Sequence, residues 1–91
     1  MNTFFVYILR SKKDGSLYIG QTNSLTNRLK KHNKGQIKST KHRIPFELIY
    51  SEKYNTRREA MFREWTLKSI AGIKEKEAIL KSLCAIKVEG V

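Results

Sequence analysis

An unbroken apolar run near the start of the chain, Phe4 to Leu9, constrains the fold more than any other feature. Because the run is short and rich in aromatic and β-branched residues, it predicts a central strand with both faces covered. Asp14-Gly15 then gives a hairpin signal, and Leu17 to Ile19 is expected to form the return strand. Gly20 closes that strand, where a missing side chain would let another backbone or a ligand come close.

The remaining chain alternates helical and strand patterns without any linker between them. Asn23 or Ser24 is expected to cap a helix that runs to about Lys34. The later elements are a third strand at Phe46–Tyr50, a helix from Thr56 to Ile70 opened by a capping box, and a last helix from Glu75 to about Ala85. The prediction is one α+β domain over residues 1–91, in the order β-β-α-β-α-α, with a small, mostly antiparallel three-stranded sheet packed with helices.

The charge of the chain points to a polyanionic partner. Nineteen Lys and Arg residues face eight Asp and Glu residues in a chain of 91 residues, a formal net charge of +11. Nucleic acid is the first candidate, and an anionic membrane surface is weaker because the lysines are dispersed. A basic surface that serves only solubility is the third interpretation. One cysteine, Cys84, and no membrane-span pattern lead us to expect a soluble, cytoplasmic, monomeric protein.

Tyr7 and Tyr18 are the first candidate site residues. They are eleven positions apart, and an odd separation across a hairpin with an even turn places both side chains on one face of the sheet. The competing interpretation is a pair of core tyrosines with satisfied hydroxyl groups.

Arg28 and His32 are four positions apart on the first helix, so they share one face, beside the apolar pair Leu25 and Leu29. This places them at the edge of the buried face, where a groove would begin. Arginine suits phosphate because its planar guanidinium donates paired hydrogen bonds, and histidine transfers protons near neutral pH. The alternative is a solvated helix face without a function.

Glu64 is an acidic residue within an apolar stripe. At about 100° per residue, it lies in line with Ala60 and Leu67. A buried carboxylate is costly unless a cation accompanies it, which favours a metal ion or a cationic phosphate site. The alternative is an exposed ion pair with Lys68, four residues on. Trp65, on the flank of the same helix, is expected in the core, with a base-stacking platform as the alternative.

The loop from Gly35 to Arg43 is basic and rich in hydroxyl groups, Ser39 and Thr40 included. Its composition suits contacts with backbone phosphates, which position a duplex without reading its sequence. A flexible solvated loop is the alternative. The candidate nucleic-acid-binding residues are Lys34, Lys38, Lys41, His42 and Arg43.

Taken in order, Val6-Tyr7, Leu17 to Gly20, Arg28, His32 and Glu64 resemble the motifs of the GIY-YIG nuclease domain. The resemblance covers about Phe4 to Lys74. Within that superfamily the chain is most similar to small stand-alone bacterial proteins related to the catalytic subunit of structure-selective endonucleases, and Ser39 to Tyr50 also resembles that subgroup. Two departures stand out: Phe5 replaces the leading glycine of the first motif, and no asparagine follows Glu64.

The resemblance implies roles for these residues. Glu64 would be the sole protein ligand of one divalent cation, Mg²⁺ or Mn²⁺. Arg28 would hold the non-bridging phosphate oxygens, and Tyr7 would activate the attacking water with a pKa lowered by Arg28 and the metal. Tyr18 and His32 would orient that water and assist proton transfer. The implied reaction is hydrolysis of DNA phosphodiester bonds, with branched or flapped DNA in repair or recombination as a candidate substrate.

Two other functions stay open from the sequence. The missing asparagine favours a nucleic-acid-binding module that needs a protein partner for activity, and RNA stays open as its ligand because phosphate contacts do not distinguish the two. A basic protein without a catalytic role is the third function. It predicts that Tyr7, Tyr18, Arg28 and Glu64 do not meet in space.

Overall fold

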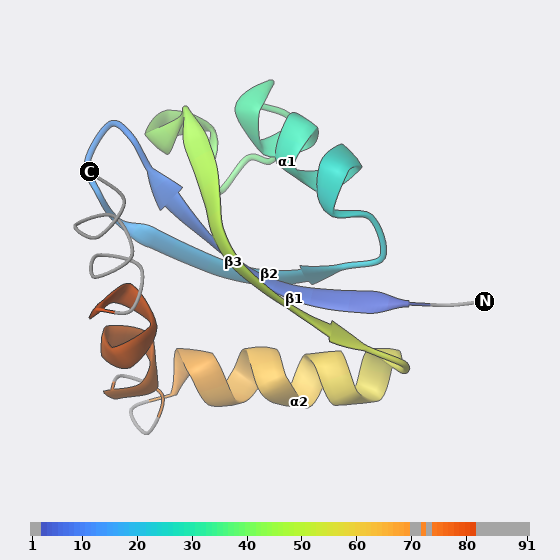
Figure 1. Ribbon diagram of the computed structural model, residues 1–91. Coiled ribbons are helices and arrows are strands. Elements are labelled where there is room, and N and C mark those ends of the chain that lie inside the picture. Colours follow the sequence, from blue (N-terminus) through green and yellow to red (C-terminus); the bar gives the residue numbers. More distant parts are fainter. Residues whose placement is uncertain (1–2, 70–71, 73, 82–91) are drawn as a thin grey trace, which may run out of the picture.

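The structure, a computed structural model, describes residues 3–69, 72 and 74–81 (Figure 1). Three strands form an antiparallel sheet in the order β2-β1-β3, and the helices α1 and α2 cover its opposite faces. The elements are β1 (Phe4–Ser11), β2 (Leu17–Thr22), α1 (Leu25–Asn33), a 3₁₀ turn (Lys41–Arg43), β3 (Phe46–Tyr54), α2 (Arg57–Lys68) and a helix over 74–81. The predicted α+β class and element order are confirmed; residues 82–85 of the last helix, including Cys84, lie outside the described residues.

Strand β1 is the centre of the sheet, as the apolar run predicts. Residues of β1 are buried on both faces, and the strand pairs with β2 on one side and β3 on the other. The hairpin loop is longer than a two-residue turn, since Ser11 N donates to Ser16 O at 2.8 Å and Gly15 has a φ of 77°. Residues 12–15 are an even number, so the loop still places Tyr7 and Tyr18 on the same face.

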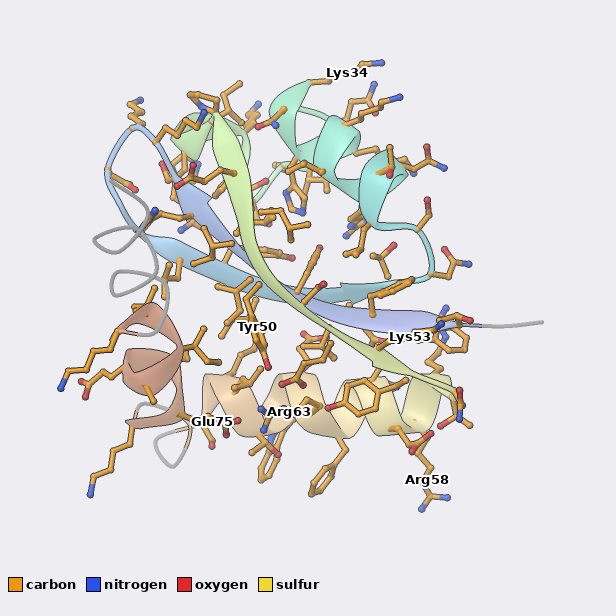
Figure 2. The ribbon with its side chains drawn as sticks, viewed as in Figure 1. Lys34, Tyr50, Lys53, Arg58, Arg63 and Glu75 are labelled. Carbon is orange, nitrogen blue, oxygen red and sulfur yellow. The ribbon has the colours of Figure 1, made fainter. Side chains whose placement is uncertain are left out.

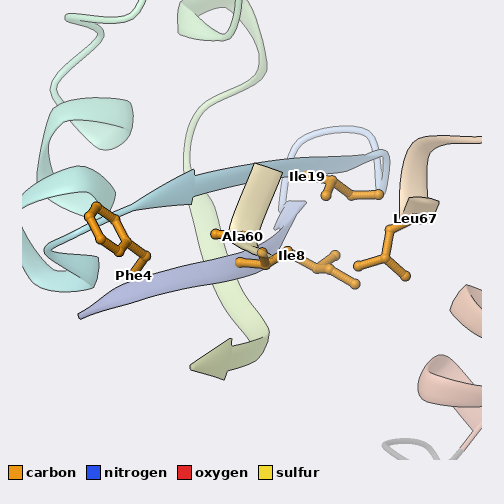
Figure 3. Packing of buried hydrophobic residues seen from close by; sticks show 6 residues of the cluster. Phe4, Ile8, Ile19, Ala60 and Leu67 are labelled. Atoms are coloured by element: carbon orange, nitrogen blue, oxygen red, sulfur yellow. The ribbon is translucent and has the colours of Figure 1, made fainter. Parts of the chain in front are cut away.

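The apolar core lies between the sheet and α2 (Figure 3). Ala60 and Leu67 are fully buried against alternate residues of β1, which include Val6 and Ile8. Successive side chains of a strand point to opposite faces, so Tyr7 and Leu9 face α1 instead. One face of β1 therefore packs on the apolar core beneath α2, and the other places Tyr7 beside polar side chains of α1.

Helix α2 is less buried than its pattern predicts. The capping box is confirmed, because the Thr56 hydroxyl accepts from the Glu59 N–H at 3.1 Å, but the helix ends at Lys68 rather than Ile70. Trp65 is 68% exposed, so its assignment to the core was wrong. The reason is the helix period: Trp65 lies about 160° from Leu67, which is the residue that faces the sheet.

A partly buried ion-pair network attaches α2 to β3 (Figure 2). The Glu52 carboxylate accepts from Arg63 at 2.7 and 2.8 Å and from the hydroxyls of Tyr50 at 2.5 Å and Tyr54 at 2.6 Å. Arg63 also pairs with Glu75 of the helix over 74–81. Burial opposes ionisation of Glu52, but these donors outweigh it and hold its pKa at about 2. Within the described residues, every helix falls short of the length and apolar character needed to cross a membrane.

Candidate active site

The candidate site lies at the outer edge of β2, and Gly20 shapes it. A Cβ atom at Gly20 would lie 2.5 Å from the Tyr7 hydroxyl oxygen and 2.7 Å from its Cζ. The Tyr7 side chain therefore crosses the edge strand directly over this glycine. The group that comes close to Gly20 is thus a side chain of the neighbouring strand. Tyr18 lies beside it, with ring centroids 6.2 Å apart.

His32 is the buried residue of α1, although its pattern predicts a place at the edge of the buried face. Its side chain is fully buried, whereas Leu25 and Leu29 are only half-buried. The imidazole fits among aromatic rings of the sheet, 4.9 Å from Tyr18 and 5.7 Å from Phe46 between centroids. The α1 side of the sheet thus buries a polar residue, and hydrogen bonds must satisfy it.

Both nitrogens of His32 have partners. Nε2 lies 3.2 Å from the Tyr7 hydroxyl, and Nδ1 lies 2.8 Å from the hydroxyl of Thr40. Thr40 is fully buried, so it is not available to phosphate as the loop composition predicts. Its hydroxyl also donates to the carbonyl of Ile37 at 3.4 Å. Thr40 is the site residue that sequence reasoning missed, because only the folded loop brings it under the imidazole.

The hydrogen bonds have a consistent direction. Arg28 Nε can only donate, and it lies 3.4 Å from the Tyr7 oxygen. With the Thr40 hydroxyl donating to Ile37, the consistent assignment is that it accepts from Nδ1–H of His32, which leaves Nε2 with a lone pair for the Tyr7 proton. The chain of donors therefore runs from Arg28 through Tyr7 and His32 to Thr40.

Burial sets the protonation states of this pair. It lowers the pKa of His32 to about 4, helped by the positive charges of Arg28 and Arg43. Burial also raises the pKa of Tyr7, against the hydrogen bond from Arg28 that lowers it. Arg28 thus acts on the pKa of Tyr7 in the expected, lowering direction, although burial raises that pKa more in the protein without a metal ion. Both groups are neutral near pH 7, with the imidazole ready to accept a proton.

Arg28 joins the site to a cationic surface. Hydrogen bonding to Tyr7 raises the pKa of its guanidinium, so the charge is permanent. Arg28 also lines a polar hollow of about 450 Å³ along α1. The hollow is lined by Thr22, Asn23, Ser24, Asn27, Arg28, Lys30, Lys31, Lys34 and Gln36.

Glu64 approaches the site from α2, on the other side of the sheet. Its negative charge is one of the groups that raise the pKa of Tyr7, after burial and Tyr18. The side chain is 21% exposed, and Oε2 pairs with Lys68 Nζ at 2.6 Å. Lys68 in turn lies 6.0 Å above the ring of Tyr18. Glu64 is therefore partly buried, and the ion pair with Lys68, the alternative interpretation of this residue, is present.

The acidic groups fit only one type of metal site. Among the described residues, no group of three or more His, Cys, Asp or Glu side chains could enclose an ion. Glu64 is a lone, partly exposed carboxylate with Lys68 as its hydrogen-bonded partner in that part of the chain. One carboxylate suits a hard dication that keeps most of its water, such as Mg²⁺.

The basic loop presents most of its cations to solvent. Lys34, Lys38, Lys41 and His42 are exposed. Arg43 instead turns inward, where Nη1 donates to the Ser16 hydroxyl at 2.8 Å and the guanidinium lies 5.5 Å above the Phe46 ring. Arg43 thus holds the loop against the hairpin.

Comparisons with known proteins show the family of the chain. The family model of the GIY-YIG catalytic domain matches residues 3–77. A UPF0213 protein of Bacillus licheniformis is 43% identical over 88% of this chain and 81% of the relative, and one of Staphylococcus aureus is 42% identical over 87% and 96%. The solution NMR structure of a UPF0213 protein from Bacillus halodurans is 36% identical, with a TM-score of 0.54 over 87% of this chain and 83% of that one. The chain therefore belongs to the GIY-YIG catalytic domain family, a family of nucleases.

Proposed function

We propose that this protein is a metal-dependent endonuclease that hydrolyses DNA phosphodiester bonds. The observation that carries the proposal is the contact of the neutral Tyr7–His32 pair with the Arg28 guanidinium, within reach of the negative charge of Glu64 on α2. A proton acceptor, a fixed cation and a lone carboxylate together match the needs of in-line displacement at phosphorus. Net charge of +11 favours the polyanionic substrate.

Tyr7 and His32 would move the proton of the attacking water. As the water oxygen bonds to phosphorus, its proton passes to the Tyr7 oxygen while the Tyr7 proton passes to Nε2 of His32, 3.2 Å away. Burial keeps His32 neutral near pH 7, so Nε2 is free to accept. The P–O bond to the leaving sugar then breaks, and the leaving oxygen takes up a proton from solvent water to become a hydroxyl.

Arg28 would bind the non-bridging oxygens of the phosphate, where negative charge grows during displacement. Its hydrogen bond to Tyr7 places this charge beside the proton acceptor. Tyr18, 6.2 Å from Tyr7 between centroids, would orient the water through its hydroxyl. Thr40 would act as a positioning residue, since its hydroxyl fixes which nitrogen of His32 carries the proton.

Glu64 would hold one divalent cation, Mg²⁺ or Mn²⁺. Such an ion stabilises charge on the phosphate and the leaving oxygen. Along the substrate, the backbone phosphates would follow the polar hollow of α1, with Lys30, Lys31 and Lys34. The exposed loop residues Lys38, Lys41 and His42 would extend that path.

Cleavage of plasmid and branched DNA by the purified protein tests this proposal. With Mg²⁺ the wild-type protein should nick DNA, and Glu64→Gln and Arg28→Met should each lose at least about a hundredfold in rate. Lys53→Met is the matched control, an exposed cation on β3 whose loss should leave the rate unchanged. Equal rates for Glu64→Gln and wild type would exclude the role of Glu64.

A nucleic-acid-binding module without activity of its own is the second candidate. The observation that favours it is the Lys68 ammonium, which already neutralises Glu64 at 2.6 Å. The absence of an asparagine after Glu64 points the same way. Salt-sensitive DNA binding without cleavage in Mg²⁺ or Mn²⁺ would select this candidate.

A further inference from the structure

The outer face of α2 exposes more large apolar surface than its inner face buries. Phe62 and Trp65 are each 68% exposed and Met61 is 53% exposed, whereas the buried residues of α2 are Ala60 and Leu67. The two aromatic rings lie 6.3 Å apart between centroids, tilted by 38°. Single exposed apolar residues are ordinary, but three on one helix face form a patch that marks an interaction site.

This patch begins at the candidate active site. Going around α2 from Glu64, Lys68 lies at about 40°, Met61 at about 60° and Trp65 at about 100°. Arg58 and Phe62 follow at about 120° and 160°. Apolar side chains and cations are therefore interspersed outward from the carboxylate, and we call these five residues the α2 stripe. Figure 2 shows Arg58 directed away from the sheet.

Charge limits what can cover the stripe. A second copy of this chain would bring another net charge of +11 against exposed Arg58 and Lys68, which opposes self-association. The fitting occupant is both aromatic and anionic. Unpaired nucleobases meet both needs, because any base stacks on an aromatic side chain while its phosphate pairs with a cation.

We infer that the α2 stripe binds the unpaired nucleotides of a single strand next to the phosphate at the candidate active site. This inference rests on the proposed function for the position of the phosphate, and it adds the class of substrate. A substrate with unpaired bases beside the cleaved bond would engage both surfaces, whereas a continuous duplex keeps its bases stacked within the helix. Beyond Phe62, a hollow of about 420 Å³ that Arg58 also lines continues the same surface.

Trp65 reports on this contact directly, because it is the single tryptophan of the chain. In EDTA, where cleavage is stopped, an oligothymidine should quench Trp65 fluorescence on binding. An abasic oligonucleotide of equal length carries the same phosphates without bases and should quench far less. A duplex of equal length should also quench far less.

Substitutions separate stacking from charge. Trp65→Ala and Phe62→Ala should each weaken oligothymidine binding by about tenfold, while binding of the abasic strand, measured by anisotropy, stays the same. Leu48→Ala is the control, an exposed apolar residue on β3, and should leave both affinities unchanged. Circular dichroism and melting of each variant establish that it is folded.

Three results would overturn the inference: equal quenching by the abasic strand, unchanged oligothymidine affinity in Trp65→Ala, or a change in Trp65 fluorescence that follows protein concentration without DNA. The last would assign the stripe to a second copy of the chain. Because these measurements are made without a divalent cation, they test the binding of bases independently of cleavage. A protein that stacks bases but cleaves nothing would refute the proposed function and leave the stripe as a binding site.

Discussion

The Tyr7 hydroxyl oxygen lies 3.2 Å from Nε2 of His32, and the opposite nitrogen of the same ring lies 2.8 Å from the Thr40 hydroxyl. A strand, a helix and a loop thus meet at one imidazole. The partner of Nδ1 decides whether Nε2 can accept a proton. Thr40 therefore controls proton transfer from Tyr7 through His32, without touching Tyr7 itself.

Replacing Thr40 with valine should impair proton transfer with little loss of shape. Valine keeps the β-branched form but cannot accept from Nδ1–H, so the neutral ring loses its preference for the Nδ1–H tautomer. We expect cleavage to fall by about tenfold to a hundredfold, while Thr40→Ser stays near wild type. Nitrogen chemical shifts of His32 measure the tautomer independently of cleavage. Wild-type shifts in Thr40→Val would contradict the positioning role.

Alanine at Gly20 should disturb Tyr7 specifically. The new Cβ would meet the Tyr7 hydroxyl oxygen at 2.5 Å, so the phenol must move. Overpacking of this kind costs about 1–3 kcal/mol in the free energy of unfolding. In a Tyr7→Leu background the close atoms are gone, and the same substitution should cost much less. Urea unfolding of the two single variants and the double variant measures this coupling; additive losses would place the strain elsewhere.

Much of the sheet around Tyr7 and Tyr18 could be predicted from residue spacing. The apolar run Phe4 to Leu9 predicts a central strand, and the odd separation of Tyr7 and Tyr18 predicts a shared face; both are confirmed. Such inferences succeed because strand alternation is a local rule. The burial of His32 could not be predicted, because it depends on Phe46 and Tyr18 arriving from other elements.

The stability of the protein should depend on pH through His32. Its pKa of about 4 lies below the unfolded value of about 6.5, so the unfolded chain binds the proton first as the pH falls. The contribution of neutral His32 to the free energy of unfolding is fully present above pH 6.5 and is lost toward pH 4, by at most about 3.4 kcal/mol. Urea unfolding between pH 7.5 and 4.5 measures it. His32→Gln should flatten this slope, and His42→Gln, at an exposed histidine, should not; a retained slope in His32→Gln would assign it to other groups.

A second acid-sensitive region lies at Glu52. Its pKa of about 2 means that its stabilising effect is present above about pH 4.5 and is lost as the pH falls toward 2. Arg63→Met should leave this carboxylate without its main partner and lower the free energy of unfolding by about 2–4 kcal/mol. Arg58→Met, at an exposed arginine on the same helix, should change it by less than about 0.5 kcal/mol. Equal losses in the two variants would show that the Glu52 network adds nothing specific.

The positions of Arg63 and Trp65 show where helix patterns fail. A helical period identifies a face, but not which of two neighbouring stripes meets the sheet. The buried residues of α2 are Ala60 and Leu67. Arg63 also turns inward because it pairs with Glu52, a residue of β3 that no local sequence pattern links to it. Trp65 consequently faces solvent.

The ion pair between Glu64 and Lys68 leads to a prediction that separates stability from metal binding. Lys68 is 49% exposed in its side chain, and an i, i+4 pair of this kind contributes about 0.3–0.5 kcal/mol. Lys68→Met should therefore hardly change the free energy of unfolding. It removes a cation beside the carboxylate, and at about 4 Å in water its repulsion of a dication is about 2 kcal/mol, so the affinity of Glu64 for Mn²⁺ should rise by about thirtyfold. Paramagnetic broadening of the amide signals near Glu64 and Tyr18 measures that affinity without any cleavage. Lys53→Met should leave the titration unchanged, and an unaltered Mn²⁺ affinity in Lys68→Met would mean that the ammonium does not compete for the carboxylate.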